Sequence, residues 1–232
     1  MLDFSKFSVL TFDCYGTMID WETGIFSALR PILKAHKKEL SDAALLELYA
    51  ELELRGEQGE FEKYRDVLQS VVRGFGLRLE FEPTNAQVRS LPDSIANWQP
   101  FPDTVQALRR LKTRYKLAVI SNIDDDLFAL TAPKLRVKFD EVITAQQARC
   151  YKPGMRIFEL AQKRIGVNPP QWLHVGQSVY HDVIPAKSLG IATVWVKRPS
   201  PRTGAGATKA ATANPDVEVS SLAALADLIG IP

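Results

Sequence analysis

The chain has 232 residues, of which 46% are hydrophobic and 24% charged, a composition typical of a globular protein that buries a core. Its formal net charge of +2, with Lys and Arg spread along the chain, argues against nucleic acid or a membrane as a partner. Two cysteines, Cys14 and Cys150, give neither a disulfide framework nor a zinc-ligand spacing. With no signal peptide and no membrane-length apolar run recognisable, we expect a soluble, cytoplasmic protein.

The first predicted element is a short apolar run, residues 7–12, which indicates a buried β-strand ending at Asp13. From Trp21 onward, apolar residues recur at helical spacing, and Ser41 stands where a helix N-cap is expected. We interpret the region through about Asn97 as a mostly helical insert.

Beyond the insert, predicted helices and strands alternate. The helices are expected near residues 104–115, 127–134, 154–165, 182–189 and 222–229, and the strands near 117–120, 141–143, 172–175, 192–196 and 217–219. This alternation predicts a Rossmann-like α/β fold, a parallel sheet with helices on both faces. Residues 199–215 are rich in Gly, Ala, Thr and Pro, and we interpret them as a mobile surface loop.

Polar residues follow four of the predicted strands. These are Asp13 through Thr17, then Ser121 and Asn122, then Lys152, and finally Gln177, Ser178 and Asp182. In an open parallel sheet, ligands bind outside the carboxyl ends of the strands. One site is therefore expected to hold two carboxylates, a hydroxyl and an ammonium group.

The residues at these strand ends are similar to the motifs of a known family. FDCYGT, ISN, YKPG and HVGQSVYHD resemble the four motifs of the haloacid dehalogenase superfamily. The resemblance covers nearly the whole chain, including the insert, where this superfamily often places its cap domain. It implies a core domain of residues 1–16 and 99–232 and a helical cap domain of residues 17–98.

Two positions bear on the chemistry that the resemblance implies. Phosphatases of the superfamily carry a second Asp two residues after the first, where this chain has Tyr15, and usually an acid where it has Gln177. A hard divalent cation favours anionic oxygen ligands, so both residues argue against Mg²⁺-dependent phosphoryl transfer. The pair Asp13 and Tyr15 instead resembles the type II L-2-haloacid dehalogenases, which need no metal. We expect no metal or other cofactor, and Mg²⁺ only if the phosphatase alternative holds.

The resemblance implies covalent catalysis on a 2-haloalkanoate, with Asp13, Lys152 and Asp182 as the catalytic residues. Asp13 would attack C2, displace halide and form an aspartyl ester, which water then hydrolyses at the Asp13 carbonyl carbon. Lys152 would keep Asp13 ionised, and Asp182 would help to activate the water. The expected substrate-contacting residues are Cys14, Tyr15, Thr17, Ser121, Asn122, Gln177, Ser178, Arg65, Trp98 and Phe158. The expected partner is the small substrate, and a homodimer is possible.

Some positions depart from that family. Its characterised members have an arginine early in the cap that receives the halide, and this chain reads YAELEL at that place, with Arg65 as one candidate substitute. Phe158 stands where they have a tyrosine, so it can shape a pocket but cannot donate a hydrogen bond. Trp98 is either a pocket residue or a hinge-packing residue, and a catalytic role for His181 is the less favoured interpretation. Two alternatives stay open: a Mg²⁺-dependent phosphatase, and a binding protein that keeps the fold but has altered chemistry.

Overall fold

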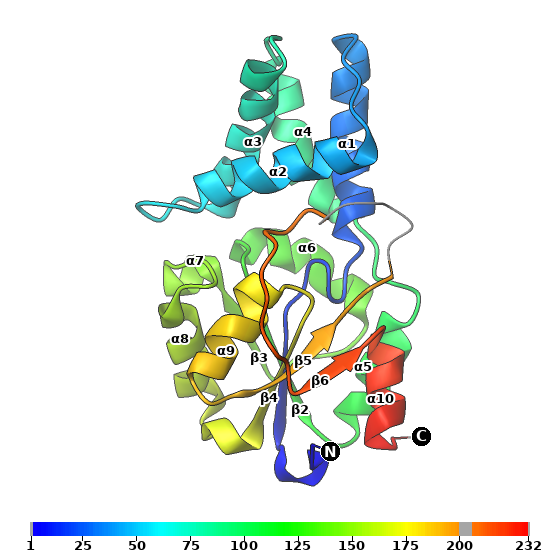
Figure 1. Cartoon of the computed structure of the whole chain (residues 1–232), viewed down its shortest axis with the longest axis vertical. Coiled ribbons are helices and arrows are strands. Elements are labelled where there is room, and N and C mark those ends of the chain that lie inside the picture. Colours follow the sequence, from blue (N-terminus) through cyan, green and yellow to red (C-terminus); the bar gives the residue numbers. More distant parts are fainter. Residues whose placement is uncertain (1, 200–205, 232) are drawn as a thin grey trace.

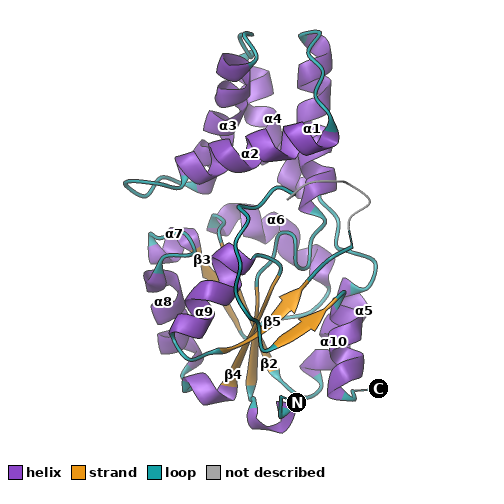
Figure 2. Cartoon of the chain, in the orientation of Figure 1, coloured by secondary structure: helices purple, strands orange, loops and turns teal. Residues whose placement is uncertain are grey.

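The computed structural model describes residues 2–199 and 206–231. Its core is a six-stranded sheet in the order β3-β2-β1-β4-β5-β6, and every neighbouring pair is parallel. Helices cover both faces of the sheet, and a group of four helices stands above the carboxyl ends of its strands (Figures 1 and 2). The predicted α/β class, a parallel sheet between helical layers, is confirmed.

The strands coincide with the apolar runs of the sequence. They are β1 (Val9–Phe12), β2 (Lys116–Ser121), β3 (Glu141–Thr144), β4 (Trp172–Gly176), β5 (Ala192–Val196) and β6 (Val217–Val219). All four residues of β1 are buried, because β2 and β4 flank this strand and helices cover both of its faces. A central parallel strand is therefore apolar along its length rather than alternating. Phe12 pairs with Val119 and Val175, which brings the ends of β1, β2 and β4 together.

The helices of the core are α5 (Thr104–Lys112), α6 (Asp125–Leu135), α7 (Ala145–Ala148), α8 (Met155–Ile165), α9 (Ile184–Ser188) and α10 (Leu222–Ile229). Helices α5 and α10 pack against each other on one face, whereas α8 and α9 lie on the other (Figure 1). The helix expected over 182–189 begins earlier, as a π-helical turn at Val179–Val183 that runs into α9. Short α7 was not expected from the sequence.

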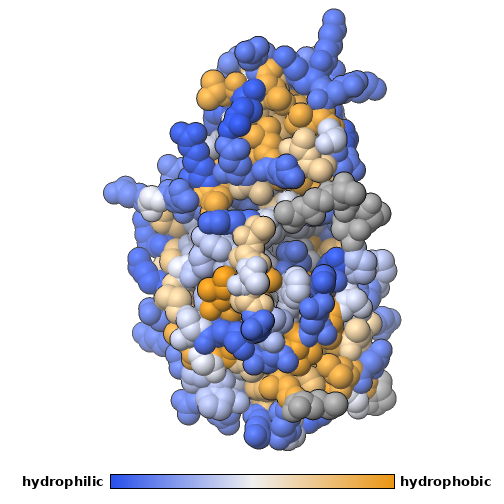
Figure 3. Space-filling model, in the orientation of Figure 1, coloured by the Kyte–Doolittle hydropathy of each residue, from blue (hydrophilic) through white to orange (hydrophobic). Residues whose placement is uncertain are grey.

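The insert consists of α1 (Trp21–Ala35), α2 (Asp42–Gly56), α3 (Tyr64–Arg78) and α4 (Asn85–Ser94). The Ser41 hydroxyl accepts a hydrogen bond from the Ala44 N–H, so the expected N-cap of α2 is confirmed. In the space-filling view, hydrophilic side chains cover most of this face, and hydrophobic residues show as separate patches on the insert and on the core (Figure 3). The division into domains of residues 1–16 with 99–232 and of 17–98 stays a prediction.

Within the described ranges 2–199 and 206–231, no helix has both the length and the apolar character needed to span a membrane. The surface loop expected over 199–215 is described from residue 206 onward, and 200–205 lie outside the described residues. Ala207 in this segment is buried, and its N–H donates to the Glu22 carboxylate of α1.

Candidate active site

The turn after β1 presents Asp13 at the end of the sheet. The chain reverses tightly here, since the N–H groups of Met18 and Ile19 both donate to the carbonyl of Cys14. Gly16 has φ +91°, a conformation that favours glycine, and a Cβ there would lie 3.0 Å from Nε1 of Trp21.

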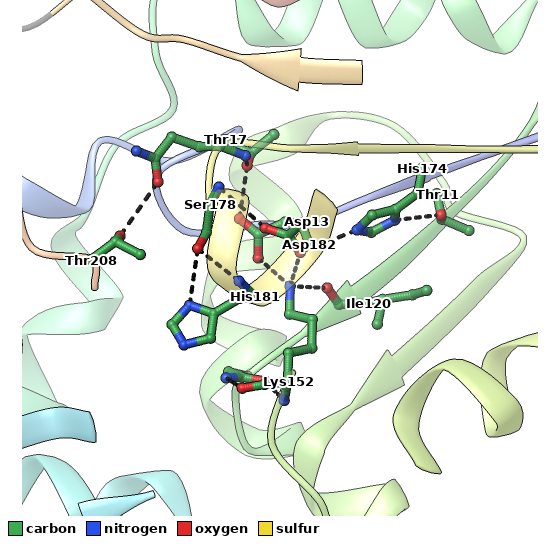
Figure 4. Close-up of polar contacts among 12 residues, drawn as sticks. Thr11, Asp13, Thr17, Ile120, Lys152, His174, Ser178, His181, Asp182 and Thr208 are labelled. Carbon is green, nitrogen blue, oxygen red and sulfur yellow. Dashed lines mark hydrogen bonds and ion pairs between the residues drawn. The ribbon is translucent and has the colours of Figure 1, made fainter. Parts of the chain in front are cut away.

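Thr17 links Asp13 to the loop after β4. Its hydroxyl donates to Oδ2 of Asp13 at 2.7 Å and accepts from the N–H of Gln177 at 2.9 Å (Figure 4). The carboxylate of Asp13 is thus oriented by a side chain that is itself held on its other side.

Lys152 lies between the two carboxylates. Its ammonium nitrogen donates to Oδ1 of Asp13 at 2.8 Å, to Oδ1 of Asp182 at 2.6 Å and to the carbonyl of Ile120 at 3.0 Å (Figure 4). A lysine ammonium has three N–H donors, so all of them are used. Asn122 fixes the backbone of Lys152, because its side-chain oxygen accepts from the Lys152 N–H and its amide donates to the Lys152 carbonyl.

Asp182 is fully buried in the π-helical turn that leads into α9. Nε2 of His174 lies 3.1 Å from its Oδ1, and the N–H of Ser178 donates to its Oδ2 at 3.3 Å. Gly176 makes room for it, because a Cβ at that position would lie 2.5 Å from Cβ and Cγ of Asp182.

The two carboxylates differ in their electrostatic surroundings. Burial alone would raise the pKa of Asp182, but the charge of Lys152 and hydrogen bonds from His174 and Lys152 hold it well below its usual value. Burial and the charge of Asp182 raise the pKa of Asp13, and Lys152 and Thr17 only partly oppose that rise. Burial would likewise lower the pKa of Lys152, but its two carboxylate partners raise it, so it stays charged. Asp13 is therefore the more basic carboxylate of the pair.

A cavity of ≈ 40 Å³ opens in front of Asp13, with space for on the order of three water molecules. Eight of the expected site residues line it: Asp13, Tyr15, Ser121, Asn122, Lys152, Gln177, Ser178 and Asp182. The structure thus brings together polar residues that follow β1, β2, β3 and β4, as the order of the motifs predicts.

Four other expected residues lie behind or away from the cavity. Cys14 is fully buried in the hydrophobic core. Trp98 packs edge-on against Tyr15 at 5.7 Å, so it stands behind the pocket wall. Phe158 is fully buried and meets the His174 ring edge-on at 5.3 Å.

Arg65 is the fourth, and its direction matters for the chemistry of the cavity. Its guanidinium pairs with Asp93 at 3.2 Å and Asp126 at 2.9 Å, both exposed, and it does not line the cavity. In this structure these two surface carboxylates hold the Arg65 side chain, and its contact with substrate stays a prediction.

The phenol of Tyr15 is also turned away from the reacting carboxylate. Its hydroxyl hydrogen-bonds the Thr131 hydroxyl at 2.8 Å, and burial raises its pKa well above the usual value. Tyr15 therefore presents ring surface to the cavity and stays protonated.

The insert contributes residues that the motifs do not include. Trp21, Glu53, Glu57 and Tyr64 line the cavity opposite Asp13. Glu53 falls four residues after buried Tyr49 and eight after buried Leu45, so the signal available in the sequence was an acid on the buried stripe of a helix. Thr208 also lines the cavity, and nothing in its segment of the sequence pointed to it.

The core also supplies the N-terminal cap of α3. Lys63 at the N-cap position makes no side-chain hydrogen bond to the helix. Instead, the carboxylate of Asp124, just before α6, accepts from the N–H groups of Tyr64 at 3.0 Å and Arg65 at 2.9 Å. The first turn of an insert helix is thereby bonded directly to the core.

Among residues 2–199 and 206–231, no group of three or more His, Cys, Asp or Glu side chains is arranged to hold a metal ion. The ammonium of Lys152 occupies the space between Asp13 and Asp182, and the neighbouring Gln177 is neutral. This donor set is a poor match for Mg²⁺, which favours several anionic oxygens in octahedral geometry.

Comparison with known proteins agrees with this geometry. The family model described as haloacid dehalogenase-like hydrolase matches residues 7–190. An (S)-2-haloacid dehalogenase of Pseudomonas sp. (strain YL) is 29% identical over 230 residues, covering 94% of this chain and 93% of its own. The haloacetate dehalogenase H-2 of Moraxella sp. (strain B) is 25% identical over 199 residues, covering 83% of this chain and 87% of its own.

Among solved structures, the L-2-haloacid dehalogenase from Xanthobacter autotrophicus superposes with a TM-score of 0.80 at 21% identity. The superposition covers 97% of this chain and 98% of that one. At this level of identity the likeness concerns the fold, in which both the sheet and the helical insert are shared.

Proposed function

Because the chain belongs to the haloacid dehalogenase-like hydrolases, we propose that it hydrolyses a carbon–halogen bond in a short-chain compound through an ester on Asp13. One oxygen of Asp13 attacks the halogen-bearing carbon from the side opposite the halogen. A carbon–oxygen bond forms, the carbon–halogen bond breaks, and the electron pair leaves with the halide.

Water then attacks the carbonyl carbon of Asp13, which restores the carboxylate and releases an alcohol and a proton. The substrate carbon is inverted once. Lys152 keeps Asp13 ionised before the attack, and Asp182, paired with Lys152, helps to activate the water. We further propose that residues 17–98 act as a cap domain over a core of residues 1–16 and 99–232.

One observation carries the proposal. The turn after β1 holds the buried, oriented carboxylate of Asp13 but has no second acidic residue beside it to protonate a leaving group. Tyr15 occupies the position of a general acid but directs its hydroxyl to Thr131. An alkoxide leaving group needs a proton, whereas a halide does not, so this site suits halide displacement. We accordingly propose that the reaction requires no metal ion.

The curated relatives are dehalogenases of 2-haloacids and haloacetate, so (S)-2-chloropropionate and chloroacetate are the reference substrates. We expect chloride release that EDTA leaves unchanged and that Asp13→Asn abolishes. In a single turnover in oxygen-18 water, the label should enter the Asp13 carboxylate, as read by mass spectrometry of the peptide that contains it.

Label found only in the product alcohol would mean direct attack by water and would refute the ester. Turnover of p-nitrophenyl phosphate with Mg²⁺ but not with EDTA, together with no chloride release, would instead establish the phosphatase alternative. If neither activity is found and no ester forms on Asp13, the proposed function is refuted and the alternative of a binding protein that keeps the fold is favoured.

A further inference from the structure

The wall of the cavity that faces Asp13 is acidic. Glu53 on α2 and Glu57 just beyond it lie one helical turn apart, and both line the cavity. Glu53 is 6% exposed and accepts hydrogen bonds from the hydroxyls of Tyr49, at 2.9 Å, and Tyr64. The side chain of Glu57 is also 6% exposed, and its Oε1 accepts from the Asn122 amide at 3.1 Å. Two buried carboxyl groups thus stand where the substrate must lie.

No unoccupied cationic donor lines this cavity within the described part of the chain. Lys152 is its cationic lining residue, and all three of its N–H groups are engaged. Arg65 is held on the surface by carboxylates of its own. A substrate carboxylate placed here would face Glu53 and Glu57 with no positive group to receive it, and it would be repelled by either acid in its ionised form.

Two buried polar atoms of the cavity lack hydrogen-bond partners, and both can accept a hydrogen bond. The hydroxyl oxygen of Ser121, a residue only 1% exposed, has no hydrogen-bond partner among the described residues. Nε2 of His181 also lacks one, although Oε2 of Glu57 lies 3.9 Å away. Burial lowers the pKa of His181 to about 4, so this ring is neutral near pH 7, and Nε2 offers a lone pair in the tautomer whose Nδ1–H donates to the Ser178 hydroxyl.

Aromatic surface completes this end of the cavity. Trp21 and Tyr64 both line it, and Tyr49 supports Trp21 edge-on at 5.9 Å. Aromatic faces attract cations, and aromatic walls are a common way to hold alkylammonium groups. The buried acids, the two unpartnered atoms that can accept a hydrogen bond and the ring faces together fit a ligand that is positively charged and carries N–H donors.

We propose that this end of the cavity recognises an organic ammonium group, so that short haloalkylammonium compounds are preferred over haloalkanoates of the same length. The inference rests on the proposed displacement chemistry of Asp13 and concerns only the group at the other end of the substrate. With 2-chloroethylammonium, Asp13 forms the ester as chloride leaves. Water then releases ethanolammonium, the Asp13 carboxylate and a proton.

The two products allow a test that does not depend on reactivity. Ethanolammonium and glycolate are the alcohols expected from 2-chloroethylammonium and chloroacetate, and calorimetry can compare their binding to the full chain. We expect ethanolammonium to bind at least about tenfold more tightly. Glu53→Gln and Glu57→Gln should each weaken it about tenfold, the loss typical of a charged hydrogen-bond partner. Glu47→Gln, an exposed acid on the same helix, is the matched control and should change nothing.

The pH dependence gives a second readout. Burial raises the pKa of Glu53 to about 7, against the hydrogen bonds from Tyr64 and Tyr49, and burial with the charge of Glu53 raises the pKa of Glu57. A cation favours ionised carboxylates, so ethanolammonium should bind more tightly as pH rises through about 7. The other titratable or charged groups that face this pair are Tyr49, Tyr64, Tyr151, Lys152 and His181.

The opposite pattern would overturn the inference. If glycolate binds more tightly, and loses affinity as pH rises, a protonated Glu57 is donating to an anionic substrate. Chloride release from the two chlorinated compounds, corrected for a blank without protein, tests the chemistry separately. Failure of both compounds would refute the proposed function, whereas turnover of chloroacetate with no selective binding of ethanolammonium would refute only the ammonium site.

Discussion

Replacing Lys152 with methionine removes the single ammonium group that separates two buried carboxylates. The Lys152 side chain is 1% exposed, and its nitrogen lies 2.8 Å from Asp13 and 2.6 Å from Asp182. At an effective dielectric constant of about 20, each contact corresponds to ~6 kcal/mol of Coulomb attraction. Much of this is offset because lysine no longer has to be desolvated, so we expect a net loss of about 3–5 kcal/mol in the free energy of unfolding.

The loss should depend on pH in a defined direction. Lys152 holds the pKa of Asp182 below its unfolded value, so this carboxylate adds stability above the unfolded pKa and loses it as pH falls through the folded one. In Lys152→Met the folded pKa of Asp182 rises, and the folded state then gains by binding a proton. The deficit relative to the unmodified protein should therefore be largest near neutral pH and shrink toward about pH 5.

Urea denaturation at both pH values measures the deficit, and chloride release measures the effect on Asp13, which we expect to be inactive as a nucleophile. Lys187→Met is the matched control, since Lys187 and Asp216 form a pair at 2.9 Å in which the side chains are 37% and 32% exposed. That pair should contribute no more than ~1 kcal/mol. Equal losses of stability in the two variants, or chloride release by the Lys152→Met protein, would show that Lys152 does not stabilise and ionise the two buried carboxylates as we propose.

Two further substitutions test the shape of the site. Thr17→Val keeps the volume but removes the donor to Asp13 and the acceptor for the Gln177 N–H, so we expect the free energy of unfolding to fall by ~1–3 kcal/mol and chloride release to slow. Thr17→Ser should restore both stability and rate. A Thr17→Val protein with unchanged stability and rate would contradict the orienting role of Thr17. Gly176→Ala puts a Cβ 2.5 Å from Cβ and Cγ of Asp182. We expect the protein to lose ~1–3 kcal/mol of stability, measured by thermal melting, and ester hydrolysis to slow because Asp182 is displaced. An unchanged rate would mean that the site tolerates this shift.

The sheet edge of the site could be predicted from the sequence because strand ends are local features. The apolar run of β1 stops at Asp13, and that of β4 stops two residues before Ser178, so the register of parallel strands brings them together. Lys152 and Asp182 follow from the same logic, since each comes after a neighbouring strand. The order of the motifs was enough to place Lys152 and Asp182 beside Asp13 at this edge, where Lys152 bonds to both carboxylates.

The insert side could not be predicted in the same way. Which helical side chains face Asp13 depends on how α2 and α3 rotate and dock, and no local pattern reports that. Arg65 was expected near the substrate as a cation in the right region, but it is one residue after Tyr64 and so lies on a different face of α3. Glu53 and Glu57 occupy the cavity instead, and an acidic pair there changes the expected substrate more than any motif residue does.

The bonds from Asp124 to the first turn of α3 have a kinetic consequence for substrate entry. Any movement that lifts α3 from the core leaves two N–H groups of that helix without their acceptor, and loss of such a cap typically costs ~1 kcal/mol. Burial raises the pKa of Asp124, so mild acid weakens the same acceptor. We predict that substrate enters when α3 lifts from the core, and amide hydrogen exchange at Tyr64 and Arg65 should then report how often the cavity opens.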